Sequence, residues 1–193
     1  NTNHLFGAGL IELLAREMTA ELHLLRKNVL REARASGKDQ SVKLITKGVD
    51  FGSLTASADG LVDLSDIRGI DTDLVIRPFT QKGVITSLRQ FTINALNQHH
   101  GMQADERWGT RWTGMADFDG DAHEAELGTG EISALVAFQA TLAPPGEWTP
   151  DDEAWAEAAS RGRTIFAGLG CESCHRPALP LKSLAFEDPG PVD

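Results

Sequence analysis

The sequence lacks several features that define common protein classes. It contains no tyrosine, which excludes tyrosine as a metal ligand anywhere in the chain. Basic residues are few, since 18 lysines and arginines against 28 acidic residues give a net charge of −10 with histidine neutral. Without a block of basic residues, nucleic acid and anionic membrane surfaces are disfavoured as partners. No apolar run reaches the length of about 20 residues that spans a bilayer, so we expect no membrane span.

The remaining composition is that of a globular protein. The chain has 193 residues, of which 41% are hydrophobic and 24% charged, enough for one ordinary domain or two small ones. It begins at Asn1 without a signal segment, and residues 187–193 are turn formers that close no helix or strand. We therefore expect a processed piece of a longer protein.

The two cysteines are the most informative residues. They occupy positions 171 and 174 in the sequence Cys-Glu-Ser-Cys-His, with His175 directly after the second. This pattern is typical of c-type haem attachment, because two thiols at this spacing can both form thioethers with the haem vinyl groups. The adjacent imidazole can then bind the iron as its proximal ligand. The sequence thus predicts covalent haem c at Cys171 and Cys174, with His175 as an axial ligand.

Three other interpretations of the cysteine pair stay open. A redox-active Cys-x-x-Cys normally follows a strand in a βαβ unit, and no such strand is indicated before Cys171. A zinc site would need a fourth ligand, which His99 or His100 could supply. A plain disulfide between cysteines three residues apart is the least favoured.

The residues before the motif support haem. They predict a helix over residues 150–166, with Thr149 as N-cap and a proline at its first position. Gly168 and Gly170 would end this helix just before Cys171. Its expected inward positions are Ala154, Ala158 and Phe166.

Other segments indicate a mainly helical protein. Apolar spacing and capping residues predict further helices, and a stretch with alternating β-branched residues predicts a small β-hairpin. The best candidate for a domain boundary is the proline-rich stretch 144–150. The expected helices are 10–35, 84–97 and 130–142, the last capped by Thr129, and the hairpin lies within 42–64, around Gly52 and residues 58–60.

A second candidate site follows the predicted helix 84–97. His99, His100 and Met102 are side chains that can fill an axial position of haem iron, so this loop is a candidate to face a cofactor. Alternatively, paired histidines at a helix C-terminus interact with the helix dipole and water. Nearby Gln103 and Glu106 are the candidate groups for proton transfer.

An acidic stretch forms the third candidate site. Asp117, Asp119 and Asp121 alternate, and such carboxylates can converge on Ca²⁺. The match to an EF-hand loop fails, because Ala122 stands where glycine is needed and Gly128 where glutamate is needed. The alternative is a solvated acidic turn.

Several short motifs occur in a fixed order along the chain. They are residues 4–12 (His-Leu-Phe-Gly-Ala-Gly-Leu-Ile-Glu), 77–83 (Arg-Pro-Phe-Thr-Gln-Lys-Gly), 87–89 (Ser-Leu-Arg), 99–103 (His-His-Gly-Met-Gln), the acidic stretch and 168–177. Taken in order, these motifs resemble the di-haem oxidoreductase family. That family comprises peroxidase-like proteins and predicted thiol oxidoreductases, and is similar to bacterial di-haem cytochrome c peroxidases. The likeness covers most of the chain apart from about residues 30–70.

The resemblance implies a mainly α fold of class I cytochrome c-like domains with a small β-hairpin insertion. Residues 1–143 would be the later part of a first haem domain, and 144–193 the linker and opening of a second. The first haem motif of the family is absent, so a companion chain or a longer chain would supply the missing parts. The resemblance also raises the expectation of a second haem near residues 99–102, which we call the His-Met loop, and of calcium at the acidic stretch.

Three functions follow from these observations. The leading one is a di-haem peroxidase-type oxidoreductase, with Glu106 and Gln103 as candidates for its proton transfer. The alternatives are an electron-transfer cytochrome without substrate turnover, and a non-haem metal-binding module. Because haem c is attached outside the bacterial cytoplasm, we expect a periplasmic or cell-envelope location and an electron-transfer partner protein.

Overall fold

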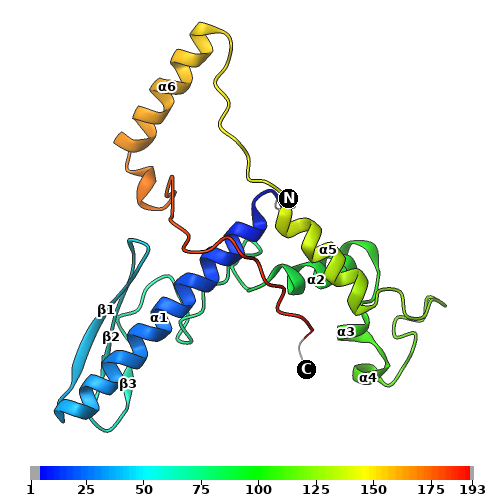
Figure 1. The fold of residues 1–193 in the computed structure, drawn as a ribbon, viewed down its shortest axis with the longest axis horizontal. Helices are drawn as coiled ribbons and strands as arrows, with labels where there is room; N and C mark the ends of the chain where they lie inside the picture. The colour runs from blue at the N-terminus through cyan, green and yellow to red at the C-terminus, as the bar shows by residue number, and fades with distance from the viewer. Residues whose placement is uncertain (1–4, 192–193) are drawn as a thin grey trace.

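The computed structural model describes residues 5–191 and is mainly helical, with one small antiparallel sheet (Figure 1). The mainly α class predicted from the sequence is therefore confirmed. The helices and strands are α1 (Ala8–Ser36), β1 (Gln40–Thr46), β2 (Val49–Ala56), β3 (Val62–Asp63), α2 (Leu88–His100), α3 (Asp105–Trp108), α4 (Thr110–Thr113), α5 (Thr129–Thr141), α6 (Glu153–Gly168) and the 3₁₀ turn η1 (Cys171–Ser173).

Helix α1 is the longest element and contacts both hydrophobic cores. It agrees with the predicted helix 10–35 and ends at Gly37, whose φ of 66° lets its N–H bond to the carbonyl of Ala33. Its N-terminal part packs against α5, where an ideal Cβ on Gly9 would lie 2.3 Å from the carbonyl oxygen of Ala140. Gly9 therefore allows the two helices to approach closely.

The sheet covers the C-terminal half of α1. Strands β1 and β2 form the predicted hairpin, but its turn lies at Lys47 and Gly48, where both residues have positive φ as a two-residue hairpin turn requires. Residues 58–60 form the second turn, which leads to β3. The core between sheet and helix consists of Met18, Leu22, Val29, Ala33, Leu44, Phe51, Leu54, Ala56 and Leu74.

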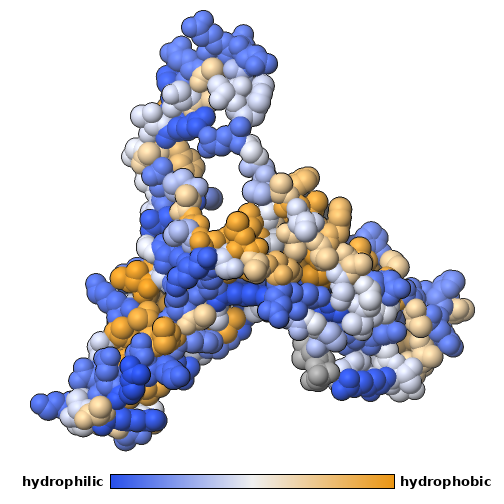
Figure 2. Space-filling view, in the orientation of Figure 1, coloured by the Kyte–Doolittle hydropathy of each residue, from blue (hydrophilic) through white to orange (hydrophobic). Residues whose placement is uncertain are grey.

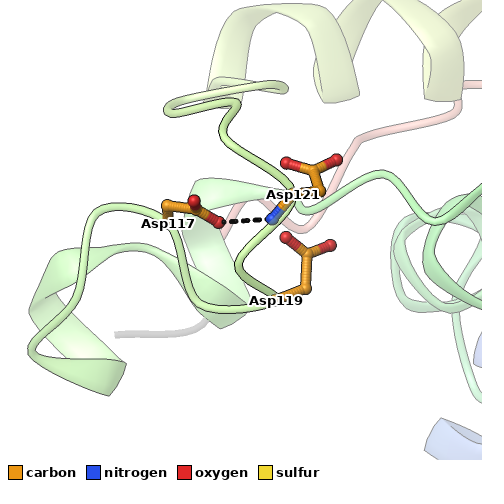
Figure 3. Close-up of side chains that lie close together, drawn as sticks. All are labelled: Asp117, Asp119 and Asp121. Atoms are coloured by element: carbon orange, nitrogen blue, oxygen red, sulfur yellow. Dashed lines mark hydrogen bonds between the residues drawn. The ribbon is translucent and has the colours of Figure 1, made fainter.

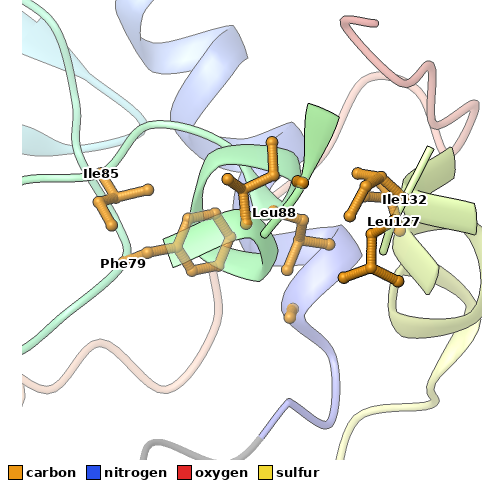
Figure 4. Packing of buried hydrophobic residues seen from close by; sticks show 9 residues of the cluster. Phe79, Ile85, Leu88, Leu127 and Ile132 are labelled. Atoms are coloured by element: carbon orange, nitrogen blue, oxygen red, sulfur yellow. The ribbon is translucent and has the colours of Figure 1, made fainter. Parts of the chain in front are cut away.

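A second core lies between α2, α5 and the start of α1. Figure 4 shows its side chains meeting between these helices. Thr92 of α2 and Gln139 of α5 add a buried hydrogen-bonded pair, 2.9 Å apart. The buried residues of this core are Ala8, Phe79, Ile85, Leu88, Ile93, Ala104, Leu127, Ile132 and Val136.

Three helix boundaries differ from the predictions. Helix α2 begins at Leu88, because Ile85 forms an isolated β-bridge with Phe79 and Ser87 takes the N-cap position. Helix α5 includes Thr129, with Gly128 before it as N-cap. Helix α6 begins at Glu153, where the carboxylate of Asp152 accepts a hydrogen bond from the N–H of Trp155 at 3.0 Å.

The C-terminal segment crosses back over α1, and we refer to residues 182–191 as the strap (Figure 1). The N–H of Lys182 donates to Glu17 at 2.8 Å, and the guanidinium of Arg16 donates to the carbonyl of Glu187 at 2.7 Å. Asp188 forms an ion pair with Arg89 of α2. No helix among residues 5–191 is long and apolar enough to cross a membrane.

Candidate functional site

The Cys-x-x-Cys-His motif forms one compact turn after α6. Gly170, with φ of 74°, reverses the chain, and η1 then places the backbone N–H of His175 2.9 Å from the carbonyl oxygen of Cys171. Both thiols are free; Cys171 is half-buried and Cys174 exposed. The turn therefore presents two accessible thiols and an exposed imidazole from five consecutive residues.

Helix α6 offers an aromatic neighbour to this turn. The rings of Phe166 and His175 meet edge to face, with centroids 5.9 Å apart. The predicted inward positions Ala154 and Phe166 are nevertheless exposed, Phe166 to 41%, and that prediction was wrong for the described chain. The physical reason is that α6 extends away from both cores, so residues 5–191 provide no helix or sheet that covers it (Figure 1).

Much of the apolar surface near the motif is exposed. Ile165 and Leu169 are 58% and 75% exposed. Apolar side chains also gather on the surface where α5 meets the start of α1 (Figure 2), and they include Phe6, Ile11 and Phe138. Exposed apolar side chains lose contact with water when a ligand or another protein surface covers them.

The second candidate site forms the end of α2. His99 and His100 lie in the last turn and are exposed, and Gly101 ends the helix with φ of 71°. The backbone N–H of Met102 donates to the carbonyl of Leu96. The Met102 side chain packs against the core between α2, α5 and the start of α1, which we call the helical core. The two histidines are thus directed to solvent while the methionine is half-buried, and their role as haem ligands stays a prediction.

The candidate residues for proton transfer lie in different surroundings. Gln103 is buried, and its N–H donates to the carboxylate of Glu126 at 2.8 Å. Glu106 accepts two hydrogen bonds from Arg89, one of them at 2.7 Å, and their side chains are 4% and 3% exposed. Glu106 therefore lies in a buried ion pair, and proton transfer from it would require a change in its contact with Arg89.

Glu106 and Arg89 line a cavity of about 660 Å³ that the sequence did not indicate. Glu12 and Arg16 of α1 line the same cavity, and residues 189–191 of the strap form another part of its wall. A carboxylate oxygen of Glu12 accepts a hydrogen bond of 2.7 Å from the backbone N–H of Leu88, at the start of α2. The cavity is therefore bordered by charged groups of α1, α2 and α3 and by uncharged residues of the strap.

Burial affects the charged groups of the cavity differently. Burial raises the pKa of the Glu12 carboxyl, and the hydrogen bond from Leu88 and the charge of Arg16 offset this only in part. Burial lowers the pKa of the Arg89 guanidinium, but Glu106 and Asp188 raise it by more, so Arg89 stays charged. Glu12 and Arg89 belong to segments 4–12 and 87–89, on which the family resemblance rests, but no sequence pattern linked either residue with Asp188.

The acidic stretch folds into a turn around one carboxylate (Figure 3). Asp117 accepts hydrogen bonds from the N–H groups of Gly120, Asp121 and Ala122 at 2.7, 3.2 and 3.0 Å. Desolvation raises the pKa of Asp117, but these three donors outweigh it and leave the pKa below its ordinary value. One oxygen from each of Asp117, Asp119 and Asp121 lies within 4.8 Å of the others, and calcium binding there stays a prediction.

The second candidate site contacts the segment that follows the acidic stretch. The Gln103–Glu126 hydrogen bond and the bridge between Ala104 and Leu127 join residues 103–104 to residues 126–127. The haem motif lies apart from both, on the other side of the first half of α1 (Figure 1). His99 and His100 therefore do not meet Cys171 and Cys174 in this structure.

No family model, curated protein or solved structure matches this chain. The likeness to di-haem oxidoreductases thus rests on the sequence motifs alone. The cytochrome c-like character of the helices stays a prediction for the same reason.

Proposed function

We propose that this chain is a c-type haem redox protein, in which Cys171 and Cys174 bind the haem covalently and His175 ligates its iron. The observation that supports this most is the chemistry of the turn at residues 171–175. Both thiols are free, and the imidazole follows them in the same turn. This donor set and spacing are those of haem c attachment.

The surroundings of the turn fit a large, flat, apolar group. Phe166 contacts the ring of His175, and the exposed side chains of Ile165 and Leu169 lie within a few residues of Cys171. These side chains would lose exposed apolar area against a porphyrin, which favours binding by about 25 cal/mol for each Å² removed from water. A bound haem supplies one-electron redox chemistry, whereas these residues hold and orient it.

The finer proposal is a peroxidase-type enzyme with a second haem, acting in the periplasm or cell envelope with an electron-transfer partner. It is supported by the ordered motifs of the resemblance. The environment of Glu106 favours the alternative, an electron-transfer cytochrome without turnover. A general acid must release its proton readily, whereas the Glu106 carboxylate is held in a buried ion pair with Arg89.

The decisive experiment is expression with an intact cytochrome c maturation system. We expect one covalent haem per chain by pyridine haemochrome spectroscopy and haem staining on a denaturing gel. A Cys171→Ala/Cys174→Ala variant should lose that haem entirely, because no thiol is left to form a thioether. A Glu172→Gln/Ser173→Ala variant, changed in the same turn, should retain it.

Haem-free wild-type protein, or equal staining of both variants, would contradict the proposal. Stoichiometric zinc in haem-free protein would instead support the non-haem metal-binding module. For haem-loaded protein, a high-spin oxidised spectrum that changes on adding peroxide would favour the enzyme. A low-spin spectrum that does not respond would favour the electron carrier.

A further inference from the structure

A groove of about 520 Å³ runs along the C-terminal half of α1, far from the haem motif in sequence. Its lining residues recur every three or four positions, so they lie on one face of the helix. Apart from one leucine, all of them are basic or histidine. They are His23, Arg26, Lys27, Leu30, Arg31 and Arg34.

The lysine and the arginines of this groove form no ion pair with an acidic side chain among the described residues. The side chains of Arg26, Lys27 and Arg34 form no ion pair or hydrogen bond within the part of the chain that the structure describes, and the Arg31 side chain contacts only the side-chain oxygen of Asn28. His23 differs from them, since its ring nitrogen lies 2.8 Å from the backbone carbonyl oxygen of Asp73 and the Asp73 carboxylate interacts with it electrostatically. Like charges one helical turn apart destabilise a helix, so this arrangement costs the free protein stability.

Several cations elsewhere in the chain form ion pairs. Carboxylates neutralise cations of α1, α2, α6, the hairpin turn and the strap, as in the pairs of Arg16, Lys47, Arg89, Arg161 and Lys182. Acidic residues outnumber basic ones by 28 to 18, yet Glu32 is the sole acidic residue between positions 22 and 38. The groove is therefore a local basic surface on an acidic protein, and such a surface attracts a negatively charged ligand.

The dimensions of the groove favour an extended ligand. His23 and Arg34 are separated by a helix rise of about 16 Å, which equals about five residues of extended peptide. A single phosphate or other small anion would contact only part of this row. Arginine pairs well with carboxylates through two parallel hydrogen bonds, and Leu30 adds an apolar contact between the cations.

We propose that this groove binds an extended acidic segment of a partner protein. A carboxylate-rich peptide about five residues long would contact the basic row while meeting little of the remaining acidic surface. Nucleic acid fits less well, because no aromatic side chain lines the groove to stack on bases. A bilayer also fits less well, since helices that bind membranes as a surface usually present tryptophan or phenylalanine beside their basic residues.

The proposal can be tested by fluorescence anisotropy with the full chain. The probe is a fluorescein-labelled peptide of about ten residues in which glutamate alternates with serine, and its control has glutamine in place of glutamate. We expect binding of the glutamate peptide alone, with an affinity that falls as salt is added. An Arg26→Gln/Lys27→Gln/Arg34→Gln variant should bind at least about tenfold more weakly, because three attractive charges are removed.

A matched variant separates the groove from the overall charge. Lys38→Gln/Lys43→Gln/Lys82→Gln removes the same three charges from exposed positions outside the groove and should bind like the wild type. Circular dichroism establishes that both variants are folded. Equal weakening in both variants, or no binding of the glutamate peptide at low salt, would overturn the proposal. So would groove-dependent binding of oligothymidine or phosphatidylserine vesicles that is tighter than binding of the peptide.

Discussion

Glu12 shows how one residue joins distant parts of this fold. Its side chain is fully buried, and its two oxygens accept hydrogen bonds from Arg16 on the same helix and from the N–H of Leu88 on another. The second bond satisfies a backbone donor at the start of α2 that has no partner within its own helix. The carboxylate also lies at the positive end of the α2 dipole, where a negative charge is stabilised.

The buried position of Glu12 makes the stability of the protein depend on pH. Its pKa is raised above the ordinary value of 4.5 in the folded state, so above that pH the folded state retains a proton that the unfolded state has lost. The free energy of unfolding should therefore fall as the pH rises through the folded pKa, by about 1.4 kcal/mol for each unit of the shift. A Glu12→Gln variant should lack this fall while retaining an acceptor for Leu88.

Urea unfolding of both proteins between pH 4 and pH 8 measures this difference at each pH. Subtracting one curve from the other removes the contribution of other carboxyl groups. Glu124→Gln, at an exposed position, is the control and should give a curve parallel to the wild type. Parallel curves for wild type and Glu12→Gln would show that Glu12 does not titrate as we infer.

The sequence indicated single residues of the site better than their partners. Glu106 was identified because it lies close to the His-Met loop and carries a titratable group. Its contact with Arg89, which is 17 positions away, depends on how α2 and α3 pack and has no sequence signature. The same applies to Asp188, which lies 99 positions from Arg89.

At the scale of the elements, the four long helices were predictable, whereas the short helices α3 and α4 and the details of the sheet were not. Helix α1 could be predicted because its sequence has a long apolar stripe and a glycine, Gly37, directly after its last residue, and both features are local in sequence. The hairpin turn at Lys47 and Gly48 lacks the usual Asn-Gly or Asp-Gly pair, so the sequence offered no clear turn there. Gly52, which was expected near a turn, lies inside β2 instead.

The position of Gly52 explains why β2 needs a glycine. Its φ is +88°, and an ideal Cβ there would lie 1.9 Å from the carbonyl oxygen of Asp66. We expect Gly52→Ala to destabilise the protein by more than about 3 kcal/mol, because the change adds both backbone strain and a steric overlap. Thermal or urea unfolding measures the loss.

Gly48 provides the matched control for this substitution. It also has positive φ, +77°, but an added Cβ would meet no atom within 4 Å. Gly48→Ala should therefore cost only the backbone strain, about 1 to 2 kcal/mol. Equal losses at the two positions would mean that the close approach of Asp66 does not constrain β2.

At the scale of the whole molecule, the strap links the segment after the haem motif to α1, to α2 and to the core between α2, α5 and the start of α1. It contacts α1 through Glu17 and Arg16, and α2 through Arg89, while Phe186 packs against the helical core. Helix α6 and η1 thus belong to a chain segment that extends away from α1, α2 and α5 after the end of α5 and returns to these helices at the strap (Figure 1). We refer to the part of the protein formed by the two cores as the body. Any haem on η1 would be attached to a segment fixed to the body at both ends.

The ion pair of Asp188 with Arg89 should hold the end of the strap. We expect Asp188→Ala to lower the free energy of unfolding by about 1.5 kcal/mol, the low end for a hydrogen bond to a charged group. Arg89 keeps its contact with Glu106, and the Asp188 side chain is already 26% exposed, so the loss stays modest. A segment released in this way should become more accessible to protease well before the protein unfolds.

Limited trypsin digestion with mass spectrometry tests the strap directly, because cleavage after Lys182 reports whether it is bound. Cleavage there should be about tenfold faster in Asp188→Ala than in the wild type, as expected for about 1.5 kcal/mol of weaker closure. Glu187→Ala removes the same charge one residue earlier but retains the backbone carbonyl that Arg16 binds, so its rate should be unchanged. Faster cleavage in both variants would trace the effect to the charge of the segment, and an unchanged rate in both would show that Arg89 does not hold the strap.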